Sequence, residues 1–206
     1  MTASTRYTLR STVTSPFGRK VRIAIDLLGL SGRVTLAPAD TLDETDTLRM
    51  QNPLGKMPCL LLDDGTAIYD SAVIIEFLAE MAGDERLIPP RGLPRYRALT
   101  RATLADGIAE AALLMVYEGR FRDADKHSPR WLAHQRGKIE RGLAAFEADL
   151  PDPARTDIVA IGLACALGYL DWRQPVSWRP AYPKLAAWLT AFAAHEPAFG
   201  RSAAPQ

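Results

Sequence analysis

The chain has 206 residues, of which 48% are hydrophobic and 24% charged, a composition typical of a globular protein with a full core. Its 25 basic and 24 acidic residues leave a formal net charge of +1, which does not favour binding to nucleic acid or to an anionic membrane surface. Two cysteines, Cys59 and Cys165, are too few for a disulfide framework, and we expect both to be buried and reduced within their apolar stretches.

The first elements alternate between strand and helix. A strand at residues 6–10 is followed by Phe17, Val21, Ala24, Ile25 and Leu28, whose helical spacing predicts a helix from residue 16 to about residue 30. Residues 34–37 predict a second strand. The opening of the chain therefore predicts a β-α-β unit.

The next stretch predicts a β-β-α unit. Residues 40–51 are polar and weakly periodic, which indicates a loop or a short helix. Residues 58–62 and 67–69 are strand-like and flank an Asp-Asp-Gly turn, so they predict a hairpin. A helix follows, with Asp70 or Ser71 as its N-cap.

A concentration of Pro and Gly at residues 83–94 predicts a linker. Every periodic segment beyond it is helical, over residues 95–125, 128–150, 157–172 and 182–194, and residues 200–206 are expected to be a frayed tail. The sequence thus predicts an α/β domain at 1–82, a linker at 83–94 and an all-α domain at 95–206.

Targeting signals are not evident. Residues 1–6 lack the apolar core of a signal peptide, and no apolar run approaches the roughly 20 residues that cross a bilayer. We therefore expect a cytoplasmic protein that does not enter a membrane.

Ser15 stands where the first strand meets the first helix. The first turn of a helix carries unpaired N–H groups and a partial positive charge, and Pro16 suits the first helical position. The Ser15 hydroxyl is therefore a candidate to hold an anion such as a thiolate. The alternative is that Ser15 only caps its helix.

Two further segments are candidates for binding. Pro58 begins a strand, and a cis Met57–Pro58 bond would turn the Met57 amide and carbonyl outward, where a peptide ligand could pair with them as a short strand. Asp70 and Ser71, at a helix N-terminus, could hold the ammonium and carboxylate of an amino-acid-like group. Taken alone, an ordinary cap explains the second pair equally well.

Taken together, these motifs resemble the glutathione S-transferase family over nearly the whole chain. The resemblance rests on motifs that occur in the family's order and spacing: Thr14-Ser-Pro-Phe, Lys20-Val-Arg-Ile, Asn52-Pro-Leu-Gly-Lys-Met-Pro58, Asp70-Ser71, Leu104-Ala-Asp-Gly107 and Tyr182-Pro-Lys-Leu-Ala-Ala-Trp188. The first motif is similar to that of small bacterial, serine-type members.

The resemblance implies a thioredoxin-like N-terminal domain, an all-α C-terminal domain and a homodimer. It also implies reduced glutathione as co-substrate, with no other cofactor and no metal. By similarity, Ser15 would donate to the glutathione sulfur and Phe17 would lie in the same binding stretch. The remaining implied glutathione-binding residues are Lys56 at the glycine carboxylate, Met57 and Pro58 at the cysteinyl part, and Asp70, Ser71 and Asp106 at the γ-glutamyl end.

The function this implies is conjugation of glutathione to a small hydrophobic electrophile. Two alternatives stay open: a non-catalytic glutathione-binding or scaffold protein, and a glutathione-dependent peroxidase or lyase. Dithiol exchange at this site is excluded, because dithiol redox proteins of this fold carry cysteines where Ser15 and Gly18 stand. Tyr117, Trp131, Trp172 and Trp178 could line an electrophile pocket or belong to the core.

Overall fold

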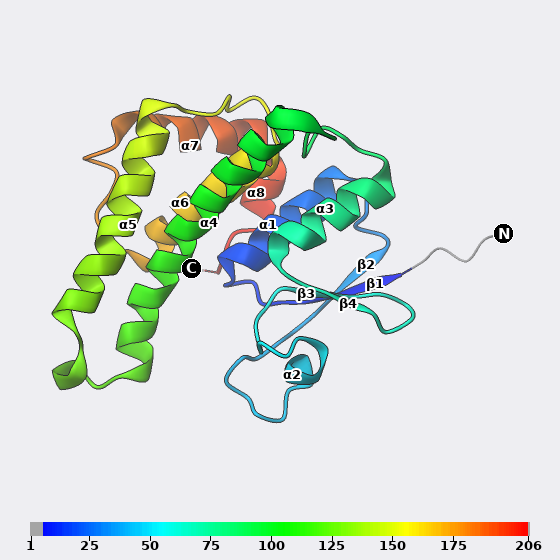
Figure 1. The fold of residues 1–206 in the computed structure, drawn as a ribbon, viewed down its shortest axis with the longest axis horizontal. Coiled ribbons are helices and arrows are strands. Elements are labelled where there is room, and N and C mark those ends of the chain that lie inside the picture. The colour runs from blue at the N-terminus through cyan, green and yellow to red at the C-terminus, as the bar shows by residue number, and fades with distance from the viewer. Residues whose placement is uncertain (1–5, 206) are drawn as a thin grey trace. The chain divides into compact units, whose positions relative to one another are not determined.

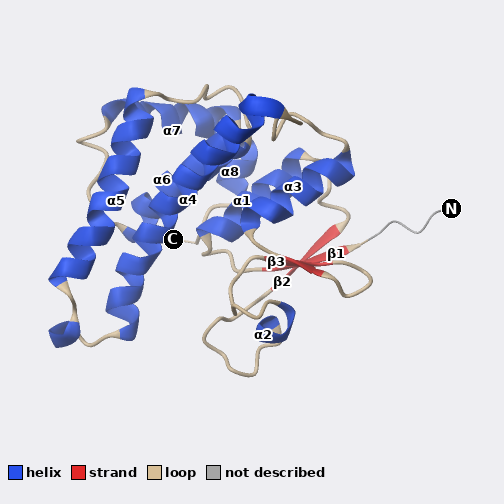
Figure 2. Ribbon diagram, in the orientation of Figure 1, coloured by secondary structure: helices blue, strands red, loops and turns tan. Residues whose placement is uncertain are grey.

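The computed structural model describes residues 6–205, which form two compact units. The first unit contains the described residues up to Ile88 together with those from Ala198 onward, and the second contains Pro89–Pro197. Figure 2 shows that the strands are confined to the first unit, whereas the second consists of helices and loops.

The first unit is built on a four-stranded mixed sheet with the order β2-β1-β3-β4. β1 runs parallel to β2 and antiparallel to β3, and β3 is antiparallel to β4. The strands are β1 (Tyr7–Arg10), β2 (Val34–Ala37), β3 (Cys59–Leu61) and β4 (Ala67–Ile68). Their order along the chain is the predicted one.

The strand register brings three chain segments to the same end of this sheet, where these strands start or stop; we call this end the sheet edge. Arg10, at the end of β1, lies opposite Cys59 at the start of β3, and Leu60 lies opposite Ile68 at the end of β4. The end of β1, the start of β3 and the end of β4 therefore meet. Two helices begin just beyond that edge.

These helices, α1 (Pro16–Leu27) and α3 (Ser71–Ala82), pack against each other on one side of the sheet, while α2 (Leu48–Gln51) lies on the other (Figure 1). Helix α1 ends three residues before the predicted limit, because the left-handed Gly29 (φ 67°) turns the chain. The apolar stripe of α1 is buried at Val21, Ala24 and Ile25, as its spacing predicts.

A short helix, α8 (Pro197–Arg201), follows where the sequence predicted a frayed tail from residue 200. From Ala198 onward the chain groups with the first unit, although 95–206 was predicted as one helical domain. Arg19 of α1 holds this segment: its Nη2 donates to the Phe199 carbonyl oxygen at 2.6 Å, and its guanidinium carbon lies 3.9 Å from the Phe199 ring centroid. Arg201 also forms an ion pair with Asp26.

The second unit is a helical bundle. Its α-helices are α4 (Gly92–Phe121), α5 (Pro129–Ala148), α6 (Ile158–Arg173) and α7 (Pro183–His195), and a 3-10 turn spans Ala124–Lys126. Helix α4 packs against both α5 and α6. Glycines of α5 and α6 allow these helices to approach α4 closely. A Cβ on Gly142 of α5 would lie 2.6 Å from Ile108, and one on Gly162 of α6 would lie 3.3 Å from Ala105.

Helix α6 is the central helix of this unit, since nearly every residue from Ile158 to Leu170 is buried. Asp157 caps it by accepting the N–H groups of Val159 and Ala160, both at 3.0 Å. In spite of this apolar character, no helix among the described residues is long and apolar enough to cross a membrane.

Helix α4 begins inside the stretch predicted as a linker. Its first residue is Gly92, and Pro94 lies in its first turn, where a missing backbone N–H breaks no helical hydrogen bond. The residues expected to interrupt the chain therefore start a helix instead.

Candidate functional site

The predicted binding residues of the first unit lie in the segments that meet at the sheet edge. Ser15 and Phe17 follow β1, Lys56, Met57 and Pro58 precede β3, and Asp70 and Ser71 follow β4. The register thus explains how residues more than 50 positions apart come to one end of the sheet. Two helix N-termini, those of α1 and α3, open at the same end.

Ser15 is the N-cap of α1. Its backbone is extended (φ −76°, ψ 121°), and its Oγ accepts the N–H of Gly18 at 3.0 Å. A hydroxyl has one proton to donate and two lone pairs, so this bond occupies acceptor capacity and leaves the proton unused by it. The capping role and the donation of a hydrogen bond to an anion are therefore compatible in one side chain.

Gly18 is required by a close contact in this turn. A Cβ at residue 18 would lie 1.9 Å from Oγ of Ser11, a side chain that is only 1% exposed. The turn that presents Ser15 therefore depends on the missing side chain at residue 18.

We expect Gly18→Ala to lower the free energy of unfolding by about 1–3 kcal/mol, because the added methyl group overpacks a buried position. Ser11→Ala should restore part of this loss in the double variant, because it removes the atom at 1.9 Å. Gly107→Ala is the matched control, since a Cβ there meets no atom within 4 Å. Urea denaturation measures all three. Equal losses for Gly18→Ala and Gly107→Ala would contradict the contact argument.

The segment before β3 is folded by Asn52, which is 2% exposed. Its Nδ2 donates to the Lys56 carbonyl oxygen at 2.8 Å, and its Oδ1 accepts the Leu54 N–H at 3.0 Å. The left-handed Gly55 (φ 60°) completes the turn. Lys56 itself is exposed, so its ammonium can reach a ligand carboxylate at the rim.

Met57 and Pro58 connect this turn to β3. The Met57–Pro58 peptide bond is cis, as is the Tyr69–Asp70 bond. Among residues 6–205, neither the N–H nor the carbonyl of Met57 has a hydrogen-bond partner. Both groups are therefore available to pair with a peptide backbone.

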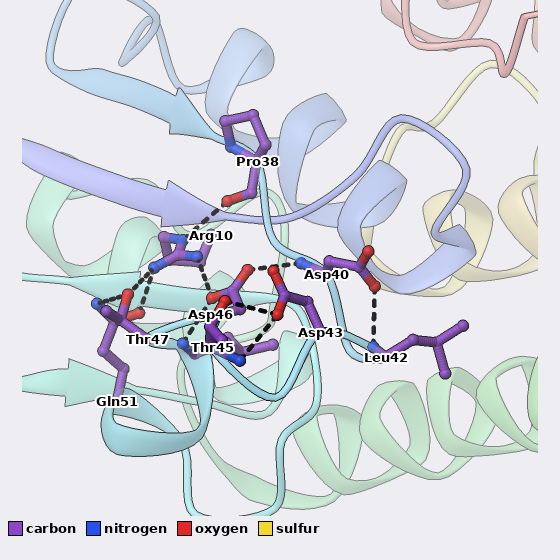
Figure 3. Close-up of polar contacts among 10 residues, drawn as sticks. Arg10, Pro38, Asp40, Leu42, Asp43, Thr45, Asp46, Thr47 and Gln51 are labelled. Carbon is purple, nitrogen blue, oxygen red and sulfur yellow. Dashed lines mark hydrogen bonds and ion pairs between the residues drawn. The ribbon is translucent and has the colours of Figure 1, made fainter.

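Arg10, at the end of β1, holds the loop of residues 38–51 against the sheet, as Figure 3 shows. Its guanidinium donates to the Pro38 carbonyl oxygen at 3.1 Å, to Thr47 Oγ1 and Gln51 Oε1 at 2.8 Å each, and to Asp46 Oδ1 at 2.6 Å. The side chain is only 10% exposed. One buried cation thus holds both ends of the loop that leads into Asn52.

Asp46 completes this cluster from the loop side. Its carboxylate accepts the backbone N–H groups of Asp40 and Leu48, both at 2.7 Å, in addition to the Arg10 bond. These backbone bonds are the main cause that lowers the pKa of Asp46 below its usual value near 3.8, and Arg10 adds to the effect. The carboxylate is therefore charged throughout the neutral range.

We expect the contribution of Asp46 to stability to be complete above pH 4 and to be lost as the pH falls further. The reason is that a lowered folded-state pKa stabilises the fold only while the carboxylate is ionised. Asp46→Asn should accordingly be less stable than the wild type at pH 6, and the difference should shrink below pH 4. Thermal unfolding across this range measures it. A difference that stays constant to pH 2.5 would contradict the assignment.

Cys59 follows Pro58 and is buried, as the sequence predicted, and Cys165 is also buried and free. Burial raises the pKa of the Cys59 thiol. The thiol therefore stays protonated and does not supply a thiolate of its own at this edge.

Asp70 and Ser71 open α3. Asp70 is the N-cap and accepts the Ala72 N–H at 2.7 Å, while Ser71 Oγ lies 3.3 Å from Asp70 Oδ1. Beneath them, Nζ of Lys20 in α1 donates to Ser71 Oγ at 3.2 Å. Both Lys20 and Ser71 are only 1% exposed. The start of α3 thus combines a carboxylate, a hydroxyl and a buried cation.

Asp106 is the one predicted glutathione-binding residue outside the first unit. It lies on α4, in the second unit, and is half-buried. Of the aromatic residues considered for an electrophile pocket, Trp178 is buried and donates its Nε1–H to Asp171 at 3.0 Å, so it belongs to the core. Trp131 is 39% exposed.

Three residues that support the site, Lys20, Asn52 and Arg10, were not predicted from the sequence. Lys20 carried a usable signal, because it falls on the apolar stripe of α1, three residues after Phe17 and four before Ala24. A lysine at such a position is either misplaced or buried with partners. Arg10 and Asn52 carried no comparable signal, since their partners come from the folded loop.

Comparisons with known proteins all indicate the same protein family. Residues 14–81 match the model of the glutathione S-transferase N-terminal domain, and residues 129–191 match that of the C-terminal domain. The uncharacterised GST-like protein YibF of Escherichia coli is 35% identical over 167 residues, which cover 78% of this chain and 80% of that protein.

Solved structures agree with these matches. The crystal structure of a glutathione transferase family member from Pseudomonas fluorescens Pf-5 with bound glutathione is 41% identical, covers 97% of this chain and 100% of its own, and has a TM-score of 0.90. A second crystal structure of a glutathione transferase family member from Pseudomonas fluorescens Pf-5, with bound S-(propanoic acid)-glutathione, is also 41% identical, covers 97% of this chain and 100% of its own, and has a TM-score of 0.86. The predicted fold class, an α/β thioredoxin-like domain plus an all-α domain, is confirmed.

Proposed function

Because this chain belongs to the glutathione S-transferase family, we propose that it binds reduced glutathione at the sheet edge of its first unit and conjugates it, through its sulfur, to a small electrophile. Ser15 stabilises the glutathione thiolate. The sulfur attacks the electrophilic carbon, a carbon–sulfur bond forms, the leaving group departs with its electron pair, and the thiol proton passes to solvent. Ser15 is not the nucleophile in this scheme.

The observation that carries this proposal is the state of the Ser15 hydroxyl. Its oxygen already accepts the Gly18 N–H at the start of α1, so the proton remains for a sulfur anion placed against the positive end of the helix. An anion at this position gains both a hydrogen bond and the helix field. Thiolate activation thus needs no separate base.

The other contacts suit the parts of a tripeptide. The unpaired N–H and carbonyl of Met57 support pairing with the cysteinyl backbone, and exposed Lys56 supports binding of the glycine carboxylate. Asp70 and Ser71 support binding of the γ-glutamyl ammonium and carboxylate. Glutathione bound to the Pseudomonas relative supports the same ligand here.

Calorimetric titration with reduced glutathione tests the first half of this proposal, and turnover of a generic aromatic halide tests the second. We expect a saturable heat signal and thiol-dependent release of halide. Binding without turnover of halides, peroxides or other electrophiles would favour the non-catalytic glutathione-binding or scaffold protein. Reduction of a peroxide, or thiol-dependent cleavage of a substrate, without conjugation would favour the peroxidase or lyase.

We further propose a homodimer, in which Asp106 reaches the γ-glutamyl end of glutathione in its own or the partner subunit. The family membership supports both statements. Light scattering of the purified protein tests whether it is a dimer. Titration of the Asp106→Asn variant with reduced glutathione tests whether Asp106 contributes to binding. Unchanged affinity in that variant would remove Asp106 from the site.

A further inference from the structure

Among the described residues of the first unit, Lys20 is the largest fully buried side chain and the one of these that carries a formal charge. Removing an ammonium group from water is costly unless the protein returns the lost interactions. The contacts of Lys20 include the hydrogen bond from its Nζ to Ser71 Oγ at 3.2 Å, which spans from α1 to the first residue of α3. This buried charge lies directly behind a residue of the proposed glutathione site.

The bond determines which way the Ser71 hydroxyl proton can point. A lysine ammonium has three protons to donate and no lone pair, so Ser71 cannot donate back to Lys20. The Ser71 proton must be directed elsewhere, and Asp70 Oδ1 lies within 3.3 Å of the same oxygen. An anion that arrives at the start of α3 competes for this proton.

The charge of Lys20 also lowers the cost of bringing an anion to this place. Asp70 already carries a carboxylate at the N-terminus of α3, so a ligand carboxylate beside it meets a like charge. A cation one hydrogen bond behind Ser71 offsets that repulsion, and water does not screen it because both side chains are buried.

We propose that Lys20 is a positioning residue for ligand recognition: by donating to Ser71 Oγ it turns the Ser71 hydroxyl toward the α-carboxylate of the γ-glutamyl group and makes the site select ligands that carry this carboxylate. The inference rests on the proposed function, because it takes glutathione as the ligand. Lys20 itself does not touch the ligand and acts through Ser71.

The test compares two ligands that differ in one group. Reduced glutathione and 4-aminobutyryl-cysteinyl-glycine, which lacks only the γ-glutamyl α-carboxylate, are titrated by calorimetry into the full-length wild type and Lys20→Met. We expect Lys20→Met to weaken glutathione binding at least about tenfold, the loss of one hydrogen bond to a charged group, and to change affinity for the analogue less than twofold. The preference for glutathione should therefore collapse.

Lys138→Met, an exposed lysine of α5, is the matched control and should keep the wild-type preference. Should Lys20→Met not fold, as judged by thermal unfolding, Lys20→Gln replaces it, because glutamine is polar and of similar length but carries no charge and offers an amide oxygen that can accept the Ser71 proton. That variant should lose most of the preference.

Three results would overturn the inference. If Lys20→Met weakens both ligands equally, Lys20 has only a structural role. If the lysine variant retains the full preference for glutathione, Lys20 does not act on the site. If the wild type binds neither ligand, the proposed function itself fails, and this outcome is distinct because it does not depend on the variant.

Discussion

Ser15→Ala should reduce the rate of glutathione conjugation by about tenfold to one hundredfold while glutathione binding stays close to that of the wild type. An ordinary thiol has a pKa near 8.5, and lowering it by two units requires about 2.7 kcal/mol of preference for the thiolate. A hydrogen bond to a charged acceptor supplies roughly 1.5–3 kcal/mol, and a helix N-terminus adds about 0.3–1 kcal/mol. The variant loses the first contribution and keeps the second.

The measurement is the pH profile of conjugation together with the apparent pKa of bound glutathione, followed by thiolate absorbance. In Ser15→Ala this pKa should rise by one to two units, about the value of the lost hydrogen bond. Rates and a thiol pKa equal to those of the wild type would remove Ser15 from the mechanism.

The chain offers a matched control for the loss of a helix cap. Ser128 caps α5 in the same way: a proline follows it, and its Oγ accepts the N–H three residues on, at 3.2 Å from Trp131 N. Ser128→Ala should cost about 1 kcal/mol of stability, as Ser15→Ala does, and leave conjugation unchanged. The pair of variants separates capping from catalysis.

Arg10→Met should cause the largest loss of stability among the variants considered, with a fall of the thermal midpoint on the order of 10 °C. The substitution keeps most of the side-chain volume but removes four hydrogen bonds at once, so the Pro38 carbonyl, Thr47, Asp46 and Gln51 lose their common partner. The carboxylate of Asp46 is then left without its cation.

The effect should extend to the ligand, because the loop held by Arg10 leads directly into Asn52 and Lys56. We expect weaker glutathione binding together with faster hydrogen exchange over residues 38–56. Arg86→Met is a suitable comparison, since the Arg86 side chain is 81% exposed and its ion pair with Asp84 contributes little. Similar midpoints for both variants would show that the Arg10 cluster does not hold the loop.

The sequence was sufficient wherever neighbouring residues determine the structure. Ser15 and Pro16 predict the start of α1, the Asp-Asp-Gly turn predicts the hairpin, and Asp70 predicts the start of α3. Each of these signals acts through bonds between residues a few positions apart, so a local pattern contains the whole cause.

The sequence was insufficient where the cause lies far along the chain. Residues 200–206 were expected to be a frayed tail because chain ends are usually poorly ordered, but residues 200 and 201 belong to α8, which Arg19 holds from about 180 positions away. Pro94 was interpreted as a breaker, although a proline in the first turn of a helix costs nothing. The position of Lys20 on the apolar stripe indicates burial, but its partner Ser71 lies 51 positions away on α3, so the local pattern could not identify the contact.

The grouping of Ala198 and the residues after it with the first unit has a consequence for how this protein is made. The ribosome completes the segment up to Ile88 more than a hundred residues before Phe199 is added, an interval of roughly 5–20 s at usual rates of translation. During that time the nascent α1 lacks the partner that Arg19 later contacts. We therefore expect the face of α1 that carries Arg19 to stay uncovered by this segment until synthesis reaches residue 199.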